Sequence, residues 1–202
     1  MLTLYDNLSS GNGYKVRLLL HQLDIPYKRI ELDIDKRETR TPEFLAKNPN
    51  GRIPTLQLDD GTYLPESNAI IFYLAESTAF LPAERLQRAQ VLQWMFFEQY
   101  SHEPNIATSR YWLTHALEIT PERKALLDSK KKGGHDALAV MEQHLARRQY
   151  FVAERYTIAD IALYAYTHVA EEGGFALGPY PAVRAWLARV AAQPRHIPIT
   201  RG

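Results

Sequence analysis

The spacing of apolar residues along the chain falls into two regimes that meet near residue 80. Before that point, short alternating runs predict strands, and apolar residues spaced three and four apart predict helices between them. The expected strands span residues 2–5, 27–32, 55–58 and 62–64, and the expected helices span residues 13–23, 41–45 and a run that begins after Ser67. This order, βαβ followed by αββα, predicts a small α/β domain that ends near Thr78.

From residue 84 onward the apolar repeat is helical throughout, which predicts an all-helical region. A long helix is expected to begin near Leu86, and Pro104 should kink or end it. Further helices are expected over residues 121–148, weakened by Gly133 and Gly134, and over residues 156–169 and 182–192. We therefore expect a domain of residues 1–78, a linker of residues 79–83 that contains Pro82, and a helical domain of residues 84–202.

Composition removes several functional classes. The chain has 202 residues, with 24 basic and 23 acidic side chains and a net charge of +1, so no field of one sign favours nucleic acid or a membrane surface as a partner. No apolar run has the form of a signal peptide or a membrane span, which favours a cytoplasmic protein. The absence of cysteine excludes disulfides and thiol catalysis by the protein itself, and the histidines lack metal-like spacing, so no metal is expected.

Two motifs close together in the chain indicate a binding site. In Gly51-Arg52-Ile53-Pro54, the Ile53–Pro54 bond can adopt the cis form at a cost of only about 0.5–1 kcal/mol, which would turn the Ile53 backbone toward an extended ligand. In Glu66-Ser67, a hydroxyl at a helix start suits a carboxylate and the acid suits an ammonium group. Each motif alone is most simply a turn or a helix cap. Together they favour a site for a peptide-like ligand.

On these motifs the chain resembles the soluble glutathione transferases, from Leu2 to about Gln193. The resemblance implies a thioredoxin-like N-terminal domain, α/β in class, followed by a helical-bundle C-terminal domain. It also implies that glutathione is the co-substrate, held by Ile53, Pro54, Glu66 and Ser67. Arg52 lies where it could meet the glycyl carboxylate of glutathione.

Catalysis in that family requires donors that stabilise a thiolate just after the first strand. Aligning Lys15-Val16-Arg17 with the family's first helix places Ser10 where theta- and zeta-type enzymes carry a catalytic serine. The same alignment places Asn12 where nu-type bacterial enzymes carry an asparagine. We take Ser10 as the first candidate and Asn12 as the second. Ser9 stays open, as does the simpler interpretation of an ordinary loop, and Tyr5 is disfavoured because it sits inside the strand.

Two further sets of residues follow from the helical region. Thr157 and Asp160 have the spacing of a capping box, which in the related enzymes opens a buried helix, so we assign them a folding role. The resemblance places a second substrate between the domains, against the first long helix. Candidates for that pocket are Tyr100, Glu103, Arg110 and Tyr111, with His102 and Asn105 nearby.

The expected activity is attack of the glutathione thiolate on a small electrophilic or peroxidic substrate, a reaction of detoxification, by a homodimer. Alternatives are a glutathione-dependent isomerase, dehalogenase or disulfide-bond reductase, because one fold hosts many chemistries. A different class, a non-catalytic protein-binding module, is argued against by the presence of both ligand motifs.

Overall fold

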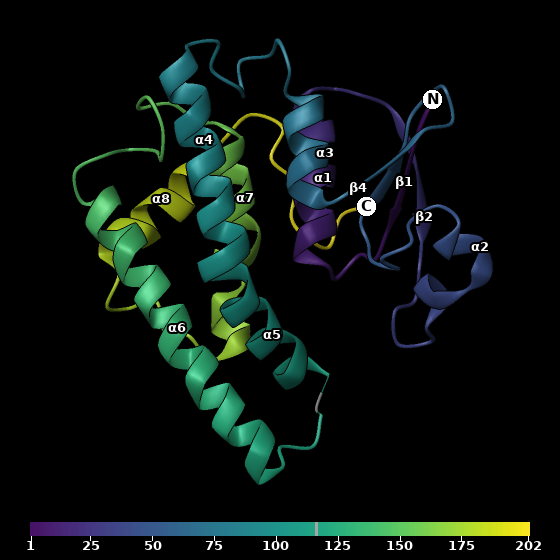
Figure 1. The fold of residues 1–202 in the computed structure, drawn as a ribbon. Helices are drawn as coiled ribbons and strands as arrows, with labels where there is room; N and C mark the ends of the chain where they lie inside the picture. Colours follow the sequence, from purple (N-terminus) through teal and green to yellow (C-terminus); the bar gives the residue numbers. More distant parts are fainter. Residues whose placement is uncertain (116) are drawn as a thin grey trace. The chain divides into compact units, whose positions relative to one another are not determined.

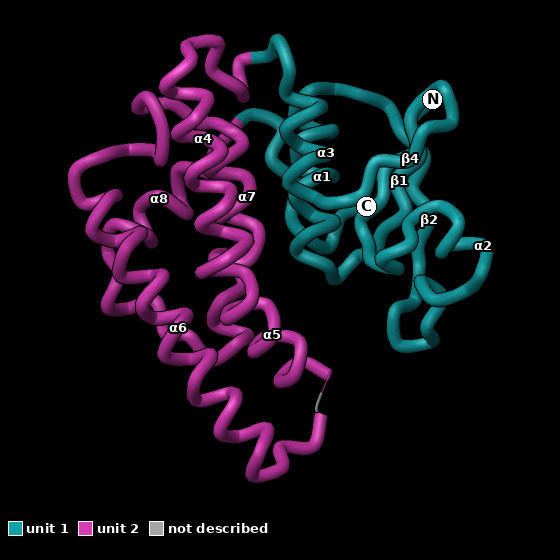
Figure 2. Tube along the Cα trace, viewed as in Figure 1, with its two compact units in different colours: residues 1–78, 194–202 teal, residues 79–193 magenta. Residues whose placement is uncertain are grey.

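The chain folds as two compact units. A computed structural model describes residues 1–115 and 117–202. One unit comprises residues 1–78 together with residues 194–202, and the other comprises residues 79–193 (Figure 2). Residues 79–83, expected as a linker, belong to the second unit. Residues 194–202, expected in the helical domain, belong to the first unit, because side chains of its first helix bind their backbone carbonyls.

The first unit is built on a four-stranded mixed sheet in the order β2-β1-β3-β4. Its elements are β1 (Leu2–Asp6), α1 (Gly11–Gln22), β2 (Tyr27–Glu31), η1 (Glu38–Arg40), α2 (Pro42–Leu45), β3 (Thr55–Gln57), β4 (Tyr63–Pro65) and α3 (Ser67–Leu74). Strands β1 and β2 are parallel, whereas β3 is antiparallel to both β1 and β4. Helices α1 and α3 pack together on one face of the sheet, and α2 lies on the other (Figure 1). The expected thioredoxin-like domain is confirmed.

The core of this unit lies between the sheet and the helix pair. Leu4 and Leu56 are cross-strand partners on β1 and β3, and both are fully buried. Helix α1 buries Leu18, Leu19 and Leu20 in succession, so it is enclosed on more than one side. Burial of this kind fixes α1 firmly, which matters because its first turn carries the candidate catalytic residues.

The second unit is helical, as expected. Its elements are α4 (Arg85–Phe97), the π-helical turn η2 (Glu98–His102), α5 (Glu103–Thr114), α6 (Pro121–Leu145), α7 (Ile158–Thr167), η3 (Ala170–Gly173) and α8 (Pro181–Ala191). Every residue of α7 is buried, and α7 packs against α4, α5 and α8. Helix α7 is therefore the central helix of the bundle.

The chain stays helical through Pro104, and the change in the helix comes at the turn just before this proline. The chain passes from α4 into α5 through η2, where the Glu103 N–H bonds to the carbonyl of Glu98, five residues earlier. Pro104 then occupies the first turn of α5, where a missing N–H costs least. The π-helical turn η2, which is wider than an α-helical turn, therefore accommodates the break in hydrogen bonding that the proline predicts.

Gly133 and Gly134 do not weaken α6 enough to divide it. A methyl group added at Gly134 would lie 2.3 Å from Cε1 of Phe175, and one at Gly133 would lie 2.8 Å from Oδ1 of Asn105. The two glycines therefore allow other elements of the unit to approach the α6 backbone closely. That packing offsets the low helix propensity of glycine.

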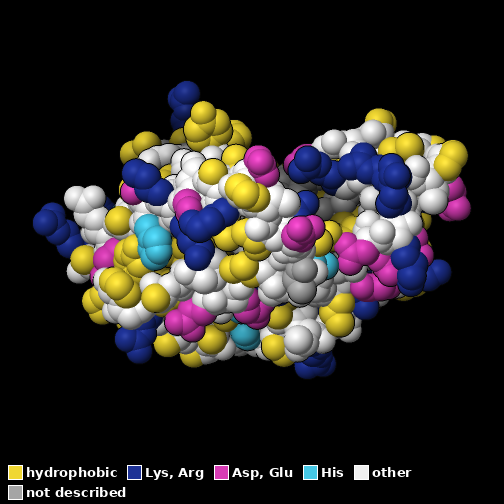
Figure 3. Space-filling model, turned by 90° about the horizontal axis from the view of Figure 1, so that it is seen from below, with side chains coloured by type: hydrophobic (Ala, Val, Ile, Leu, Met, Phe, Trp, Pro, Cys, Tyr) yellow, Lys and Arg dark blue, Asp and Glu magenta, His cyan; other side chains and the backbone are white. Residues whose placement is uncertain are grey.

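The surface carries both signs of charge. On the face shown in Figure 3, basic, acidic and apolar side chains are interspersed, in keeping with the net charge of +1. Within the described part of the chain, no helix is long and apolar enough to cross a membrane.

Candidate functional site

Ser10 is the N-cap of α1. Its backbone is extended, with φ −71° and ψ 122°, and its hydroxyl oxygen accepts a hydrogen bond from the Gly13 N–H at 3.2 Å. A serine hydroxyl has one donor and two acceptor positions, so this bond leaves its own hydrogen available to donate. Ser10 thus combines a donor with the positive end of a helix dipole, two features that stabilise an anion.

Ser9, the neighbouring alternative, is turned to a local partner. Its hydroxyl donates to Oδ1 of Asn7 at 2.7 Å, and its N–H reaches the same oxygen at 3.1 Å. Because the hydroxyl hydrogen already has an acceptor within the loop, Ser9 is a weaker candidate than Ser10 for donating to a thiolate.

Asn12 and Ser67 meet although they are 55 residues apart. The Ser67 hydroxyl donates to Oδ1 of Asn12 at 3.3 Å, and Ser67 is only 4% exposed. This contact joins the first turn of α1 to the first turn of α3. Two sets of residues that were selected on separate motifs therefore belong to one cluster.

Lys15 is part of this cluster, and sequence reasoning missed it. The side chain is fully buried, and its ammonium group donates to the Ser67 hydroxyl at 3.4 Å and to Oδ1 of Asn68 at 3.3 Å. Lysine is almost never fully buried without a specific partner, so a buried ammonium at the start of α3 marks a place suited to an anion. The available signal was its position three residues after Asn12, on the same helix face.

The Ile53–Pro54 peptide bond is cis, and a polar network supports the turn before it. Asn48, which is 2% exposed, donates from Nδ2 to the Arg52 carbonyl at 2.8 Å and to Oγ1 of Thr55 at 3.1 Å. The Thr55 hydroxyl in turn donates to the Arg52 carbonyl at 3.2 Å. The Arg52 side chain itself is exposed. This network fixes the backbone on both sides of Ile53.

Glu66, and not Ser67, is the N-cap of α3. Glu66 has φ 70° and ψ 110°, a left-handed region that costs a non-glycine residue of the order of 1–3 kcal/mol. It is exposed, whereas Ser67 is the first residue of the helix and is buried. The simpler interpretation of Ser67 as the N-cap of this helix was therefore wrong, because the last non-helical residue before α3 is Glu66. Strained residues of this kind cluster at ligand sites.

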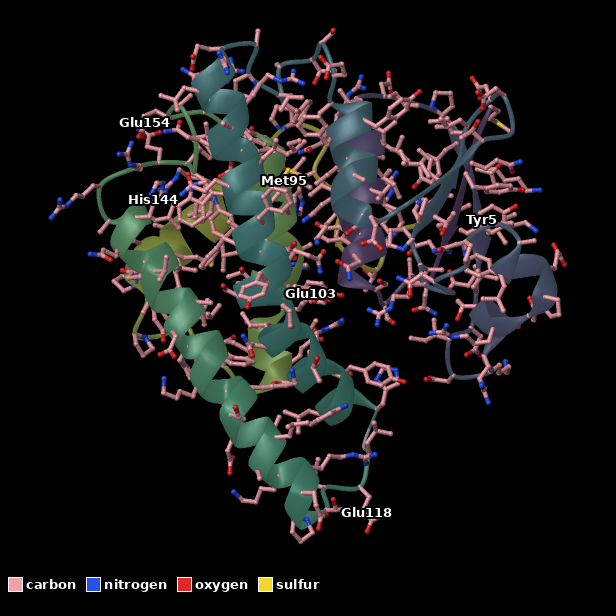
Figure 4. The ribbon with its side chains drawn as sticks, in the orientation of Figure 1. Tyr5, Met95, Glu103, Glu118, His144 and Glu154 are labelled. Carbon is pink, nitrogen blue, oxygen red and sulfur yellow. The ribbon has the colours of Figure 1, made fainter. Side chains whose placement is uncertain are left out.

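Tyr5 belongs to a different environment. Its ring packs against Phe44 of α2 at a centroid distance of 6.0 Å and against Tyr63 at 6.2 Å (Figure 4). Burial raises the pKa of the Tyr5 phenol, and the neighbouring Tyr63 adds to that effect. Tyr5 is thus a packing residue on the α2 side of the sheet.

Thr157 and Asp160 form a complete capping box at the start of α7. Oδ2 of Asp160 accepts from the Thr157 N–H at 2.9 Å, and the Thr157 oxygen accepts from the Ala159 N–H at 3.3 Å. The other Asp160 oxygen accepts from Nε1 of Trp186 at 2.9 Å. Burial raises the pKa of Asp160 to about 6, although these donors oppose the shift. The contacts are all internal, which fits a folding role.

The four candidates for a second-substrate pocket lie on η2 and α5 of the helical unit. Tyr100 is 88% exposed, Arg110 pairs with Glu172 at 2.6 Å, and the ring of Tyr111 lies 4.0 Å from that of His115. Glu103 opens α5 (Figure 4). A surface cavity of about 340 Å³ in this unit lies elsewhere, at the end of α6, and none of the four lines it.

Comparison with known proteins agrees with the fold. The family model described as "Glutathione S-transferase, N-terminal domain" matches residues 1–76, and that described as "Glutathione S-transferase, C-terminal domain" matches residues 92–194. The chain belongs to the glutathione S-transferase family.

Three relatives illustrate the range of that family. A crystal structure of a glutathione S-transferase from Pseudomonas fluorescens Pf-5 is 52% identical, has a TM-score of 0.96, and matches over 99% of both chains. The disulfide-bond oxidoreductase YfcG of Escherichia coli K12 is 30% identical over 91% of this chain and 87% of its own length. A structure of Ure2p in complex with glutathione is 25% identical, with a TM-score of 0.88, and covers 100% of this chain and 93% of its own.

Proposed function

We propose that the protein is a glutathione transferase in which Ser10 activates the thiol of glutathione. The observation that carries the proposal is the cluster of Asn12, Lys15 and Ser67, because it brings a buried cation and a hydroxyl to the turn that carries Ser10. The complex of Ure2p with glutathione supports the choice of ligand, since that protein has the same fold.

The peptide part of glutathione would lie along the cis-proline turn. The Ile53 backbone would pair with the cysteinyl backbone, while Pro54 shapes the turn and Arg52 meets the glycyl carboxylate. The γ-glutamyl carboxylate would bind at the start of α3, where Ser67 donates and Lys15 supplies charge. The exposed carboxylate of Glu66 would take the γ-glutamyl ammonium group.

The chemistry would follow from thiolate stabilisation. A free cysteine thiol has a pKa near 8.5, and lowering it by two pKa units requires about 2.7 kcal/mol of preference for the anion. The Ser10 hydroxyl, with Asn12 as the second donor, would supply that preference together with the α1 dipole. The thiol proton leaves to solvent, the sulfur forms a bond to the electrophilic atom, and the leaving group departs with its bonding electrons.

A second candidate is a glutathione-dependent disulfide-bond reductase. The relative named as a disulfide-bond oxidoreductase favours it. Because this chain contains no cysteine, both thiols of the exchange would come from glutathione and the substrate. Tighter binding of oxidised than of reduced glutathione would favour this activity over transfer.

The first experiment is calorimetric titration with reduced glutathione, measured beside the thiolate absorbance of the complex across pH. Binding with a lowered thiol pKa supports an activated-thiol enzyme, and turnover of chlorodinitrobenzene, a maleyl compound, a chloroalkane and a glutathionyl disulfide then identifies the reaction. Binding without a shift supports the disulfide reductase. No binding would refute both and would favour a protein-binding module.

We also propose a homodimer, formed through exposed apolar side chains on α4 and η2. Leu86, Phe96 and Tyr100 are 63%, 69% and 88% exposed, which is unusual for such large side chains on one helical segment. Sedimentation equilibrium should give twice the chain mass, and Phe96→Glu should halve it. A monomeric wild-type protein would contradict the proposal.

A further inference from the structure

Arg17 is a fully buried residue of α1 whose guanidinium group binds three parts of the first unit. Nε donates to Oδ2 of Asp6 at 2.8 Å, and Nη2 donates to the Leu8 carbonyl at 2.7 Å. Nη1 donates to the Ile199 carbonyl at 2.9 Å and also to the Arg201 carbonyl. Four of the five guanidinium N–H donors thus have acceptors. A flexible lysine could not reproduce this planar arrangement.

The C-terminal segment, residues 194–202, is held by one face of α1. His21 pairs through Nδ1 with the Arg195 carbonyl at 2.8 Å, and the Tyr14 hydroxyl donates to the Ile197 carbonyl at 2.6 Å. Together with Arg17, these side chains recur at intervals of three and four residues, which places them on the same face. Their acceptors are alternate backbone carbonyls of a segment that turns twice, at Arg195, which has φ 57°, and at residues 198–201, where the Arg201 N–H bonds to the Pro198 carbonyl at 3.0 Å. Figure 1 shows this segment, in yellow, running beside α1.

Arg17 also binds the backbone of the loop that carries Ser10. The Leu8 carbonyl, which accepts from Arg17, is two residues from Ser10. The Asp6 carboxylate lies under the first turn of α1, so close that a methyl group added at Gly13 would come within 1.5 Å of Oδ1. Arg17 therefore ties the loop, the strand that precedes it and the C-terminal segment to a single rigid group.

We propose that Arg17 is a positioning residue for the Ser10 loop, and that the C-terminal segment holds the Arg17 guanidinium group in place through its backbone carbonyls. The inference rests on the proposed function, because its consequence is the orientation of the Ser10 hydroxyl toward a bound thiol. Without the segment, two guanidinium donors would lose their acceptors, and the group could reorient away from the Leu8 carbonyl. Displacement of the segment would then loosen the loop without touching any ligand contact.

The test uses the full chain with three substitutions. Tyr14→Phe removes one hydroxyl that binds the segment and leaves Arg17 intact. Arg17→Lys keeps the charge but loses the planar set of donors. Tyr63→Phe is the matched control, since Tyr63 lies beside Tyr5 on the α2 side of the sheet. Amide hydrogen exchange over residues 7–13 is measured in each variant, followed by the thiol pKa of bound reduced glutathione.

If the C-terminal segment supports the Ser10 loop through Arg17, amide exchange over residues 7–13 becomes about tenfold faster in both Tyr14→Phe and Arg17→Lys. Exchange over these residues stays unchanged in Tyr63→Phe. The same support through Arg17 also predicts a rise of about one unit in the bound thiol pKa, which mere loss of stability would not produce. Unchanged exchange at residues 7–13 in Tyr14→Phe, with faster exchange confined to residues 195–202, would overturn the inference. If Arg17→Lys fails to fold, Tyr14→Phe still decides.

Glutathione binding by the wild-type protein distinguishes failure of the proposed function from failure of the inference about Arg17 and the C-terminal segment. If the wild-type protein binds no glutathione, the proposed function is refuted, and with it the catalytic consequence of the coupling. If the wild-type protein binds glutathione with a lowered thiol pKa but Tyr14→Phe leaves that pKa and the exchange unaltered, only the inference about the segment is refuted.

Discussion

The hydroxyl of Ser67 donates to the side-chain oxygen of Asn12 at 3.3 Å, and this bond connects the first turns of α3 and α1. The two residues were selected from separate motifs, one for thiol activation and one for carboxylate binding. Their contact means that a ligand bound at one of them lies beside the other.

Substitution of Ser67 should weaken the binding of glutathione. Ser67→Ala removes the hydroxyl that would donate to the γ-glutamyl carboxylate, and a lost hydrogen bond to a charged group costs about 1–3 kcal/mol. Calorimetry with reduced glutathione measures the effect, and Ser9→Ala, in the exposed part of the loop, serves as the control. Equal affinity of Ser67→Ala and the wild-type protein would remove Ser67 from the binding site.

Substitution of Lys15 should lower affinity for the same carboxylate. Lys15→Met keeps much of the volume of the side chain and removes the buried charge, so glutathione should bind at least tenfold more weakly, which corresponds to about 1.4 kcal/mol. Glutathione ethyl ester, blocked at the glycyl carboxylate, separates the two ends of the ligand. If Lys15 acts at the γ-glutamyl end, the variant should lose the same factor with the ester as with glutathione.

Ser10→Ala should raise the pKa of the bound thiol and reduce kcat. The substitution also removes the N-cap bond to Gly13, which should cost about 1 kcal/mol of stability, so thermal unfolding is measured in parallel. Ser9→Ala should leave the pH–rate profile unchanged, because that hydroxyl donates to Asn7. A shifted profile in Ser9→Ala and an unshifted one in Ser10→Ala would reverse the assignment.

The secondary structure, the cis-proline turn and the start of α3 were accessible from sequence for a physical reason. Local signals carry them: alternation and helical repeats for the elements, a proline for the turn, and hydroxyl or acidic residues at helix starts. The strands of the α/β domain lie within a residue or so of their expected positions, as at β2, Tyr27–Glu31. The capping spacing of Thr157 and Asp160 likewise depends only on neighbours in the chain.

The features that sequence did not predict depend on distant contacts. Residues 194–202 join the first unit through their backbone carbonyls, which carry no side-chain signature. Burial of Lys15 depends on α3 packing against α1, and a lysine at that position otherwise suggests a solvated helix face. Gly134 lowers helix propensity locally, yet α6 continues because Phe175 fills the space that a side chain would take.

Gly13→Ala should destabilise the first unit. An added methyl group would lie 1.5 Å from Oδ1 of Asp6, and Asp6 is held by Arg17, so neither side can yield easily. Overpacking of this kind typically costs about 1–3 kcal/mol, measured here by urea unfolding. Gly178→Ala is the control, because a methyl group there meets nothing within 4 Å. Equal losses in the two variants would show that the close contact carries no energetic weight.

The stabilisation that comes from protonated Asp6 and Asp160 should fall as the pH rises from about 4 to about 6. Burial raises the pKa of Asp6 from 3.8 to about 6, against the opposing effect of Arg17, and burial raises that of Asp160 to a similar value. Between these limits the folded protein holds protons that the unfolded chain has released, so the unfolded state gains relative stability as the pH increases. For Asp6 alone, a difference of about two pKa units corresponds to roughly 3 kcal/mol.

The Asp6 contribution can be isolated by comparing slopes instead of absolute stabilities. Asp6→Asn leaves Arg17 buried without its carboxylate, so the variant should be less stable at every pH, but its free energy of unfolding should fall less steeply between pH 4 and 6. The exposed Asp35→Asn is the control and should keep the wild-type slope. The lowered pKa values of Asp33 and Asp60 act mainly below this window, because their stabilising effect is lost only as the pH falls through them. Urea unfolding at half-unit pH intervals measures the slopes, and an identical slope in Asp6→Asn and the wild-type protein would mean that Asp6 does not hold its proton in this range.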